Sequence, residues 1–217
     1  MKILIVRNSE TAPEGAFGDW LLRQGHELEV VRGEDVTEAQ MRDAELVVLL
    51  GSPRAVYQTD IPWIAGQRPM VAARLAAQSP TIGICFGAQM MAAATGGEVT
   101  RNPEGVFFRG WRGIDDTAEP VLEGPWPRWH GDVIIPPPGA EVIARDSGTV
   151  QAFRLPKAIA VQFHPEATPE LLQDWARLSP PGAADPAALA EDSARLFPAR
   201  AEARERLFAM LLREAGV

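Results

Sequence analysis

The stretch Gly83–Gln89, GICFGAQ, lies where an apolar run ends and a run of helix formers begins, and it contains the only cysteine of the chain. A cysteine flanked by glycines two residues away on each side, between a buried strand and a helix, is typical of a nucleophile elbow. This tight turn lifts the central side chain into the open, and the helix N-terminus behind it favours a thiolate over a thiol. We therefore interpret Cys85 as a nucleophile, with a buried inert cysteine as the alternative.

Short apolar runs on either side of this stretch alternate with helix-compatible segments over the first hundred residues. The runs are 3–6, 28–31, 46–50 and 81–84. Near-continuous apolar strands in this rhythm predict a mainly parallel sheet with helices on both faces, an α/β fold of three layers, α/β/α. From residue 98 to about 163 the sequence changes to short strands and turns. This change predicts an antiparallel extension of the same sheet.

Local signals predict where several helices begin and end. Asp60 followed by Ile61 and Pro62 predicts an N-cap with proline in the first turn, opening a helix that reaches about Ala77. After Pro169 the pattern is helical again, with helices expected near 171–178, 186–197 and 199–215. The sequence has no internal repeat and no boundary typical of a second domain. We expect one domain over residues 1–217, with a C-terminal helical extension from about 180 to 217.

Composition excludes several classes of function. A formal net charge of −8 and a pI near 5.0 argue against binding to nucleic acid or to an anionic membrane surface. The apolar runs are far shorter than the roughly 20 residues of a membrane helix. The N-terminal residues lack the pattern of a signal peptide, and one cysteine cannot form an internal disulfide, so we expect a cytoplasmic protein. Three scattered histidines and one cysteine show no metal-ligand spacing, and we expect neither a metal nor a cofactor.

A candidate base lies far downstream, in the stretch Val161–Glu166, VQFHPE. In an extended segment His164 and Glu166 would point to the same side, because side chains two residues apart share a face. One group could then take the thiol proton while the other orients the imidazole, which is the logic of a catalytic triad. The alternative is a histidine with a purely structural role at the end of a strand.

Acyl chemistry also needs hydrogen-bond donors for an oxyanion. The main-chain N–H of Phe86, directly after the nucleophile, is one candidate. The loop that begins with Gly51 and Ser52 follows another expected parallel strand and could supply the second donor. Glycine at position 51 permits a close approach of the backbone to a neighbour. An ordinary turn at the end of a strand is the alternative for this loop.

These stretches together resemble the class I glutamine amidotransferases, the Cys-His-Glu enzymes that release ammonia from the side chain of glutamine. The resemblance rests on GICFGAQ, QFHPE and GSPRAVY in this order and covers roughly residues 1–178. It is strongest to stand-alone members that are similar to the glutaminase domain of guanosine monophosphate synthetase, including gamma-glutamyl peptidases and hydrolases of gamma-glutamyl amides. The stretch Trp129–Asp132, WHGD, is similar to a segment of the same subgroup.

The resemblance implies a role for each matching residue. Cys85 is the nucleophile, His164 is the base and later the acid, and Glu166 orients His164. Gln89 matches a position that lines the glutamyl pocket, on the first turn of the elbow helix. Where the family often has Gly-Gly-Pro this chain has Gly-Ser-Pro, so the second oxyanion donor is the N–H of Ser52. Gly51 in the same loop is expected to contact the substrate.

One segment departs from the family pattern. Between Asn102 and Trp111, related stand-alone members tend to carry a glutamate, whereas this chain has Phe107, Phe108 and Arg109. An apolar wall here would suit an amide that bears a bulky or aromatic amine. For the nearby His130 we expect a structural role in which Asp132 holds the ring, with direct catalysis as the alternative.

The sequence therefore predicts hydrolysis of the gamma-glutamyl amide bond of glutamine or of a gamma-glutamyl amide, through a glutamyl thioester and without a cofactor. The expected partner is a small gamma-glutamyl substrate. A first alternative is a glutaminase subunit that delivers ammonia to a separate synthetase or ligase. A second alternative is an inactive relative with a binding or regulatory role.

Overall fold

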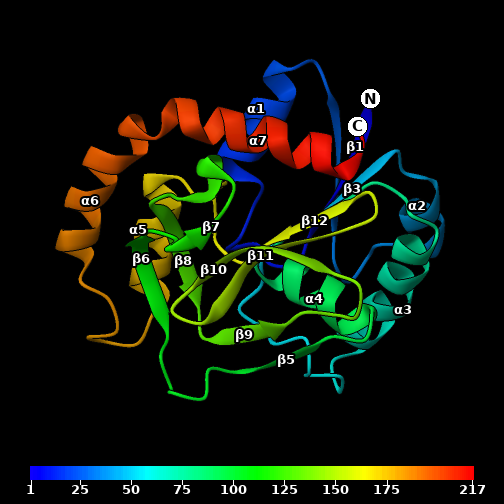
Figure 1. Cartoon of the computed structure of the whole chain (residues 1–217), viewed down its shortest axis with the longest axis horizontal. Helices are drawn as coiled ribbons and strands as arrows, with labels where there is room; N and C mark the ends of the chain where they lie inside the picture. The colour runs from blue at the N-terminus through cyan, green and yellow to red at the C-terminus, as the bar shows by residue number, and fades with distance from the viewer.

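The apolar runs of the sequence form the parallel part of a central eight-stranded sheet in the computed structural model, which describes residues 1–217 (Figure 1). Five neighbouring strands run parallel to one another in the order β2-β1-β3-β4-β12. Their bounds are β1 (Lys2–Arg7), β2 (Glu27–Arg32), β3 (Leu46–Leu49), β4 (Thr81–Ile84) and β12 (Ala158–Val161). The predicted α/β fold with a mainly parallel sheet is confirmed.

Three strands continue this sheet beyond β12 in antiparallel orientation. They are β11 (Thr149–Leu155), β10 (Glu141–Asp146) and the two-residue β7 (Asp116–Thr117). The predicted antiparallel extension is thus confirmed for these strands. It is wrong for β12, which lies within the stretch expected to be antiparallel but pairs in parallel with β4.

The remaining strands form two separate ribbons instead of joining the sheet, so the prediction of one continuous extension is wrong for them. In the first ribbon β5 (Glu98–Arg101) pairs with β9 (Asp132–Ile135), and in the second β6 (Phe108–Arg112) pairs with β8 (Trp126–His130). Alternation of apolar residues predicts a strand but does not specify its partner.

Helices cover both faces of the sheet, because successive side chains of each strand point to opposite faces. Helices α1 (Gly15–Arg23) and α7 (Ala201–Ala215) lie on one face, and α3 (Pro62–Ala76) and α4 (Phe86–Ala94) lie on the other (Figure 1). The first face packs the core residues Ile3, Ile5, Val48, Phe17, Leu207 and Phe208 together. The second packs Leu4, Val6, Val47, Val71, Met90 and Met91. The expected three layers are therefore present.

Shorter or peripheral helices complete the chain. Helix α2 (Glu38–Asp43) packs beside α3, and the 3-10 helix η1 (Pro120–Leu122) contacts α7. Helices α5 (Pro169–Leu178) and α6 (Pro186–Ala199) pack against each other and share a smaller apolar cluster. Each of the three C-terminal helices begins and ends within two residues of its expected bounds.

The expected N-cap of α3 is wrong. The cap is Ile61, and it makes no side-chain capping bond. Since Pro62 occupies the first helical position, the residue directly before it must be the cap, which leaves Asp60 one position too early.

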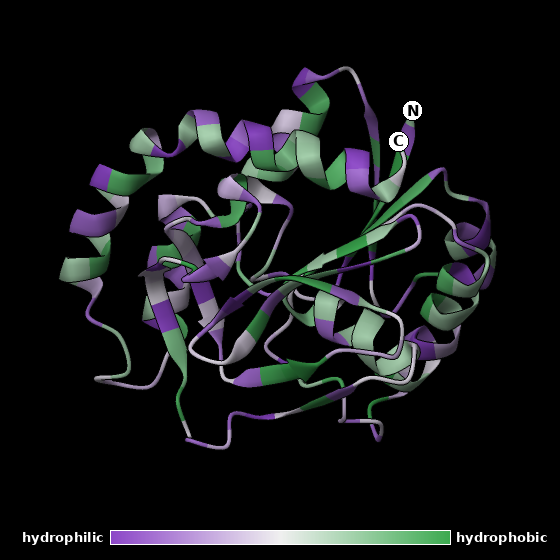
Figure 2. Ribbon diagram, in the orientation of Figure 1, coloured by the Kyte–Doolittle hydropathy of each residue, from purple (hydrophilic) through white to green (hydrophobic).

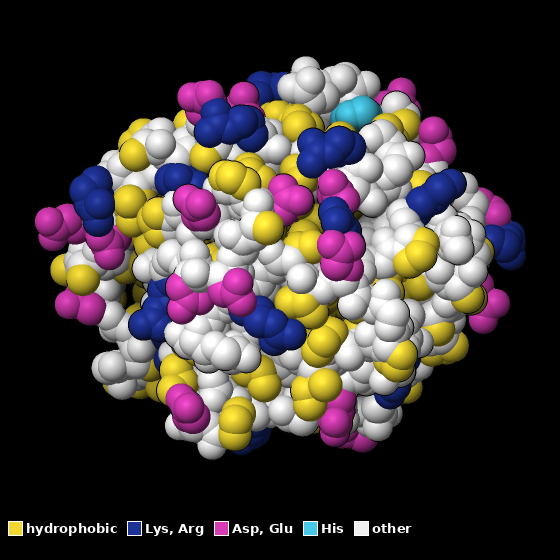
Figure 3. All heavy atoms as spheres, in the orientation of Figure 1, with side chains coloured by type: hydrophobic (Ala, Val, Ile, Leu, Met, Phe, Trp, Pro, Cys, Tyr) yellow, Lys and Arg dark blue, Asp and Glu magenta, His cyan; other side chains and the backbone are white.

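The outer surface is mixed in charge and the interior is apolar. The inner parallel strands β1, β3, β4 and β12 are mostly hydrophobic along their length (Figure 2). Acidic and basic side chains alternate over the face shown in Figure 3, with small apolar areas between them. None of the helices combines the length and the apolar character that crossing a bilayer requires.

The glycines on either side of Cys85 are required by close packing between β3, β4 and α4. A Cβ added at Gly87 would lie 2.0 Å from the main-chain oxygen of Leu49. A Cβ added at Gly83 would lie 2.5 Å from the sulfur of Met91 and 2.8 Å from the main-chain nitrogen of Ala88. Neither position can take a larger residue unless the neighbouring atoms shift.

We predict that Gly87→Ala lowers the free energy of unfolding, near the upper end of the roughly 1–3 kcal/mol that overpacking costs. The neighbour in its way is backbone, which cannot rotate aside as a side chain can. Urea unfolding monitored by tryptophan fluorescence measures the change.

Gly66→Ala is the matched control, since this glycine is also helical, in α3, and an added Cβ meets nothing within 4 Å. It should raise stability by about 0.5–1 kcal/mol through helix propensity. Equal stabilities for the two variants would contradict the close packing at Gly87.

Candidate active site

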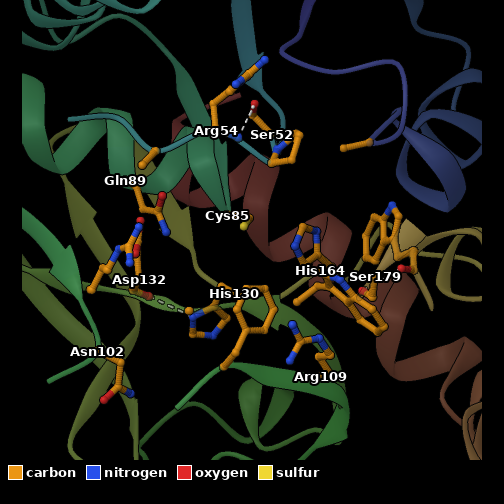
Figure 4. Close-up of a pocket in the computed structure, with 18 of the residues that line it drawn as sticks. Ser52, Arg54, Cys85, Gln89, Asn102, Arg109, His130, Asp132, His164 and Ser179 are labelled. Carbon is orange, nitrogen blue, oxygen red and sulfur yellow. Dashed lines mark hydrogen bonds between the residues drawn. The ribbon is translucent and has the colours of Figure 1, made fainter. Parts of the chain in front are cut away.

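The parallel strands bring residues that follow four of them to one edge of the sheet, including the predicted site residues Ser52, Cys85 and His164. Thr11 follows β1, Ser52 follows β3, Cys85 follows β4 and His164 follows β12. In open α/β sheets, ligands bind beyond the carboxyl ends of the strands. These four residues line a single cavity of about 810 Å³, which lies within the usual size of a small-molecule site (Figure 4).

Cys85 has a backbone conformation that is rare for any residue other than glycine, with φ 52° and ψ −106°. Such a conformation costs about 1–3 kcal/mol and persists where surrounding structure enforces it. Here Cys85 is the N-cap of α4, and its N–H donates to the main-chain oxygen of Val161 at 2.8 Å. Its side chain is only 4% exposed, so it lies in the cavity wall and is not lifted into open solvent as expected.

His164 and Glu166 form a buried pair. Nδ1 of His164 lies 2.7 Å from Oε1 of Glu166, and the residues are 3% and 1% exposed. Because an ionised carboxylate only accepts, Nδ1 is the donor and Nε2 is left for another partner. The predicted contact is confirmed, although the segment after β12 bends and turns and is not extended.

The environment of His164 favours its protonated form. Burial lowers the pKa of His164, but the charges and hydrogen bonds of Cys85 and Glu166 outweigh burial and raise the pKa to about 10. The structure thus brings together the three residues that the sequence singled out as a triad.

Trp175 of α5 holds the imidazole from a further side and was not singled out by the sequence. Its ring meets that of His164 edge-on, with centroids 4.7 Å apart, and its Nε1–H donates to the main-chain oxygen of Thr11. Trp129 packs against Trp175 at 5.8 Å. The helical spacing in α5 indicates that Trp175 is buried, but not that it reaches His164, which depends on how α5 packs.

The two expected oxyanion donors differ in their surroundings. Ser52 lines the cavity, its N–H donates to no main-chain acceptor, and its hydroxyl accepts from the N–H of Arg54 at 3.1 Å. Phe86 is the first residue of α4, where N–H groups have no acceptor within the helix. Its ring is buried against Trp63, and Phe86 is not among the residues that line the cavity.

Gly51 is not among the residues that line the cavity, and its contact with substrate stays a prediction. A Cβ at this position would lie 3.2 Å from Cε1 of His164 and 3.9 Å from Cβ of Cys85. Gly51 therefore lets the loop after β3 pack closely behind the cysteine and the histidine.

Gln89 lines the cavity from the first turn of α4, as expected, and is 4% exposed. Its Nε2 donates to Oε1 of Gln162 at 3.1 Å. This bond fixes the orientation of the Gln89 amide and leaves its oxygen free to accept.

His130 is a second buried histidine in the cavity wall, with the opposite protonation. Burial lowers the pKa of His130 to about 3, so the ring is neutral. Asp132 holds the ring as expected, but through its main-chain oxygen, 3.0 Å from Nδ1, while its carboxylate accepts from Tyr57. Because a carbonyl only accepts, Nδ1 carries the proton and the buried Nε2 is an acceptor without a partner.

We predict that the two histidines titrate at opposite ends of the pH range. Nitrogen-detected NMR of the imidazoles should show His164 protonated up to nearly pH 10 and His130 neutral with the proton on Nδ1. Interactions with Cys85 and Glu166 raise the pKa of His164, so removing either one, in Cys85→Ala or Glu166→Gln, should lower it.

The sign of the stability effect follows from the raised pKa of His164. The ordinary pKa of histidine is 6.5, so the contribution of His164 to the free energy of unfolding is complete below about pH 6.5. This contribution is lost as the pH rises toward about 10. A His164 that titrates near 6.5 in the parent protein and in both variants would contradict the geometry.

Comparison with known proteins places this chain and its fold in a family. A model of the class I glutamine amidotransferases matches residues 18–174. A glutamine-hydrolyzing GMP synthase of Pyrobaculum aerophilum is 34% identical over 140 residues, which are 61% of this chain and 26% of that protein. The corresponding enzyme of Thermus thermophilus is 35% identical over 150 residues, 59% of this chain and 26% of that protein. The chain thus matches about a quarter of the length of these relatives.

Solved structures agree with this assignment. A glutamine amidotransferase of Thermotoga maritima superposes with a TM-score of 0.85 at 23% identity, over 100% of this chain and 99% of that one, and shows the fold. A glutamine amidotransferase of Methylobacillus flagellatus gives 0.84 at 26% identity, over 99% and 94%. The family model covers most of the sequence, and the chain belongs to the class I glutamine amidotransferase family.

Proposed function

We propose that this protein hydrolyses the gamma-glutamyl amide bond of glutamine or of a gamma-glutamyl amide. The observation that carries the proposal is the meeting of Cys85 with the buried pair of His164 and Glu166 in one cavity. In this proposal residues 1–217 act as one cytoplasmic catalytic domain, with 180–217 as a helical extension.

The first half of the proposed reaction forms a thioester. The sulfur of Cys85 attacks the gamma-carbonyl carbon, and the N–H groups of Phe86 and Ser52 bind the resulting oxyanion. His164 then donates its proton to the nitrogen of the departing amine, and the carbon–nitrogen bond breaks. Glu166 keeps the imidazole oriented and stabilises its positive charge.

The second half releases glutamate. A water molecule attacks the thioester carbon while His164, now neutral, accepts the proton of the water. The carbon–sulfur bond breaks, and the thiolate of Cys85 is restored beside the imidazolium. Atoms and charges balance over the cycle without a cofactor.

A second candidate function rests on the relatives. The two relatives described above are glutamine-hydrolyzing GMP synthases, and this chain matches about a quarter of the length of each. The chain would then be a glutaminase subunit that hands ammonia to a separate synthetase or ligase. Under a third candidate the chain is an inactive relative with a binding role.

We predict that Cys85→Ala lowers kcat/KM for glutamine or for a gamma-glutamyl amide by at least about 1,000-fold, because the nucleophile is lost. Glu166→Gln should lower kcat by about 100-fold or more, because the imidazolium loses its counter-charge. Release of glutamate from purified protein measures both. Acid quenching during turnover, followed by mass spectrometry, should detect a glutamyl adduct on the peptide that contains Cys85.

Equal turnover by the parent and Cys85→Ala would rule out the proposed mechanism. Activity that appears only after a synthetase is added would favour the subunit function. No turnover and no adduct with any gamma-glutamyl compound, with or without a synthetase, would favour an inactive relative.

A further inference from the structure

The cavity is positively charged in a protein that is negatively charged as a whole. Its lining includes three arginines but only one carboxylate, that of Asp132, although the chain carries a formal net charge of −8. Of the three, Arg101 interacts with Tyr57 and Asp132. A cavity of one sign raises the local concentration of ligands of the opposite sign. This lining therefore favours a substrate with more than one anionic group.

Arg109 in particular has no anionic partner within the protein. Its buried Nε has no hydrogen-bond partner, and burial, with no compensating carboxylate, lowers the pKa of its guanidinium. The guanidinium stacks on the ring of Phe107, with Cζ 3.8 Å from the ring centroid. The ring of Phe107 in turn lies close to Gly131, where an added Cβ would be 2.7 Å from it. The charge is thus positioned by packing and left free to bind a ligand.

The position of Arg109 links it to the leaving-group side of the cavity. Strand β6 aligns it with Trp129, which packs against Trp175, and Trp175 packs against His164. In Figure 4, His164 and Arg109 lie on one side of Cys85 and Gln89 lies on the other. Since His164 must reach the departing nitrogen, the amine half of a substrate extends toward Arg109 and the glutamyl half toward Gln89.

Part of the solvent-exposed rim of the cavity is apolar. Four of the exposed large hydrophobic residues of the protein are also lining residues of this cavity: Tyr57, Val106, Phe107 and Leu178. Exposed apolar side chains gathered around one site mark a binding surface. A cavity of about 810 Å³ has room for an acyl donor several times larger than glutamine.

We propose that Arg109 determines substrate specificity by binding a carboxylate on the amine half of the substrate. The favoured substrates are then gamma-glutamyl peptides whose second residue is aromatic or large and apolar, with its carboxylate on Arg109 and its side chain against the apolar rim. The inference rests on the proposed function, because it assigns the two halves of the cavity from the roles of His164 and Gln89.

Two probes that differ only in the carboxylate test this directly: gamma-glutamylphenylalanine and gamma-glutamylphenethylamide. Binding is measured by calorimetry in a Cys85→Ala background, where hydrolysis does not interfere. Gamma-glutamylphenylalanine, which has the carboxylate, should bind roughly 10- to 100-fold more tightly than gamma-glutamylphenethylamide, as expected for a charge-assisted hydrogen bond. Arg109→Gln should remove this difference in affinity and leave the affinity for gamma-glutamylphenethylamide unchanged.

Arg112→Gln is the matched control. Arg112 lies on the same strand, stacks on Phe108 at 5.3 Å and lies outside the cavity lining, so its loss should leave the preference intact. Circular dichroism of both variants checks that they fold as the parent does.

Each other outcome has a separate meaning. Equal binding of the two probes to Cys85→Ala would overturn the inference and leave the proposed function standing. An equal loss of both probes and of glutamine in Arg109→Gln would place the glutamyl carboxylate on Arg109, which also overturns it. If neither probe binds and the parent hydrolyses no gamma-glutamyl compound, the proposed function fails and the inference fails with it.

Discussion

The backbone at Cys85 is the constraint on which the rest of the site depends. A residue with a Cβ is held at φ 52° between a buried strand and a helix. Close packing around the turn enforces this backbone conformation. At Gly87, for example, there is no room for a Cβ beside the main chain of Leu49. The turn fixes where the sulfur lies, and the helix behind it presents unpaired N–H groups. Conformational strain of this kind is maintained by the stability of the surrounding core.

The order of the strands supplies the other half of the site. Strand β12 comes about 75 residues after β4 in the sequence but pairs with it in parallel. The residues that follow these strands, Cys85 and His164, therefore meet at one edge of the sheet. The two histidines of the cavity then differ by environment alone. Burial lowers the pKa of both rings. Interactions with Cys85 and Glu166 outweigh burial at His164, whereas the hydrogen bond to the main chain of Asp132 does not outweigh it at His130, so one ring is charged and the other neutral.

Much of this architecture was predictable because local sequence encodes it. The apolar runs predicted the parallel strands β1 to β4, and the elbow glycines and the His-Pro-Glu stretch pointed to Cys85, His164 and Glu166. Strand β12 lies in the stretch expected to be antiparallel, and its parallel pairing with β4 was not predicted. Partners that depend on long-range packing were not predictable. The separate ribbons of β5 with β9 and of β6 with β8, and the contact of Trp175 with His164, leave no local signature. Local signals also failed in one detail. The sequence predicted Asp60 as the N-cap of α3, but the cap is the next residue, Ile61.

The central claim is that the fold holds one sulfur against one imidazolium, and alkylation tests it most directly because the chain has a single cysteine. The rate of reaction with iodoacetamide near neutral pH should exceed that of free cysteine and should fall to or below that rate in His164→Ala. A parent rate no greater than that of free cysteine, unchanged by loss of the imidazole, would contradict the account.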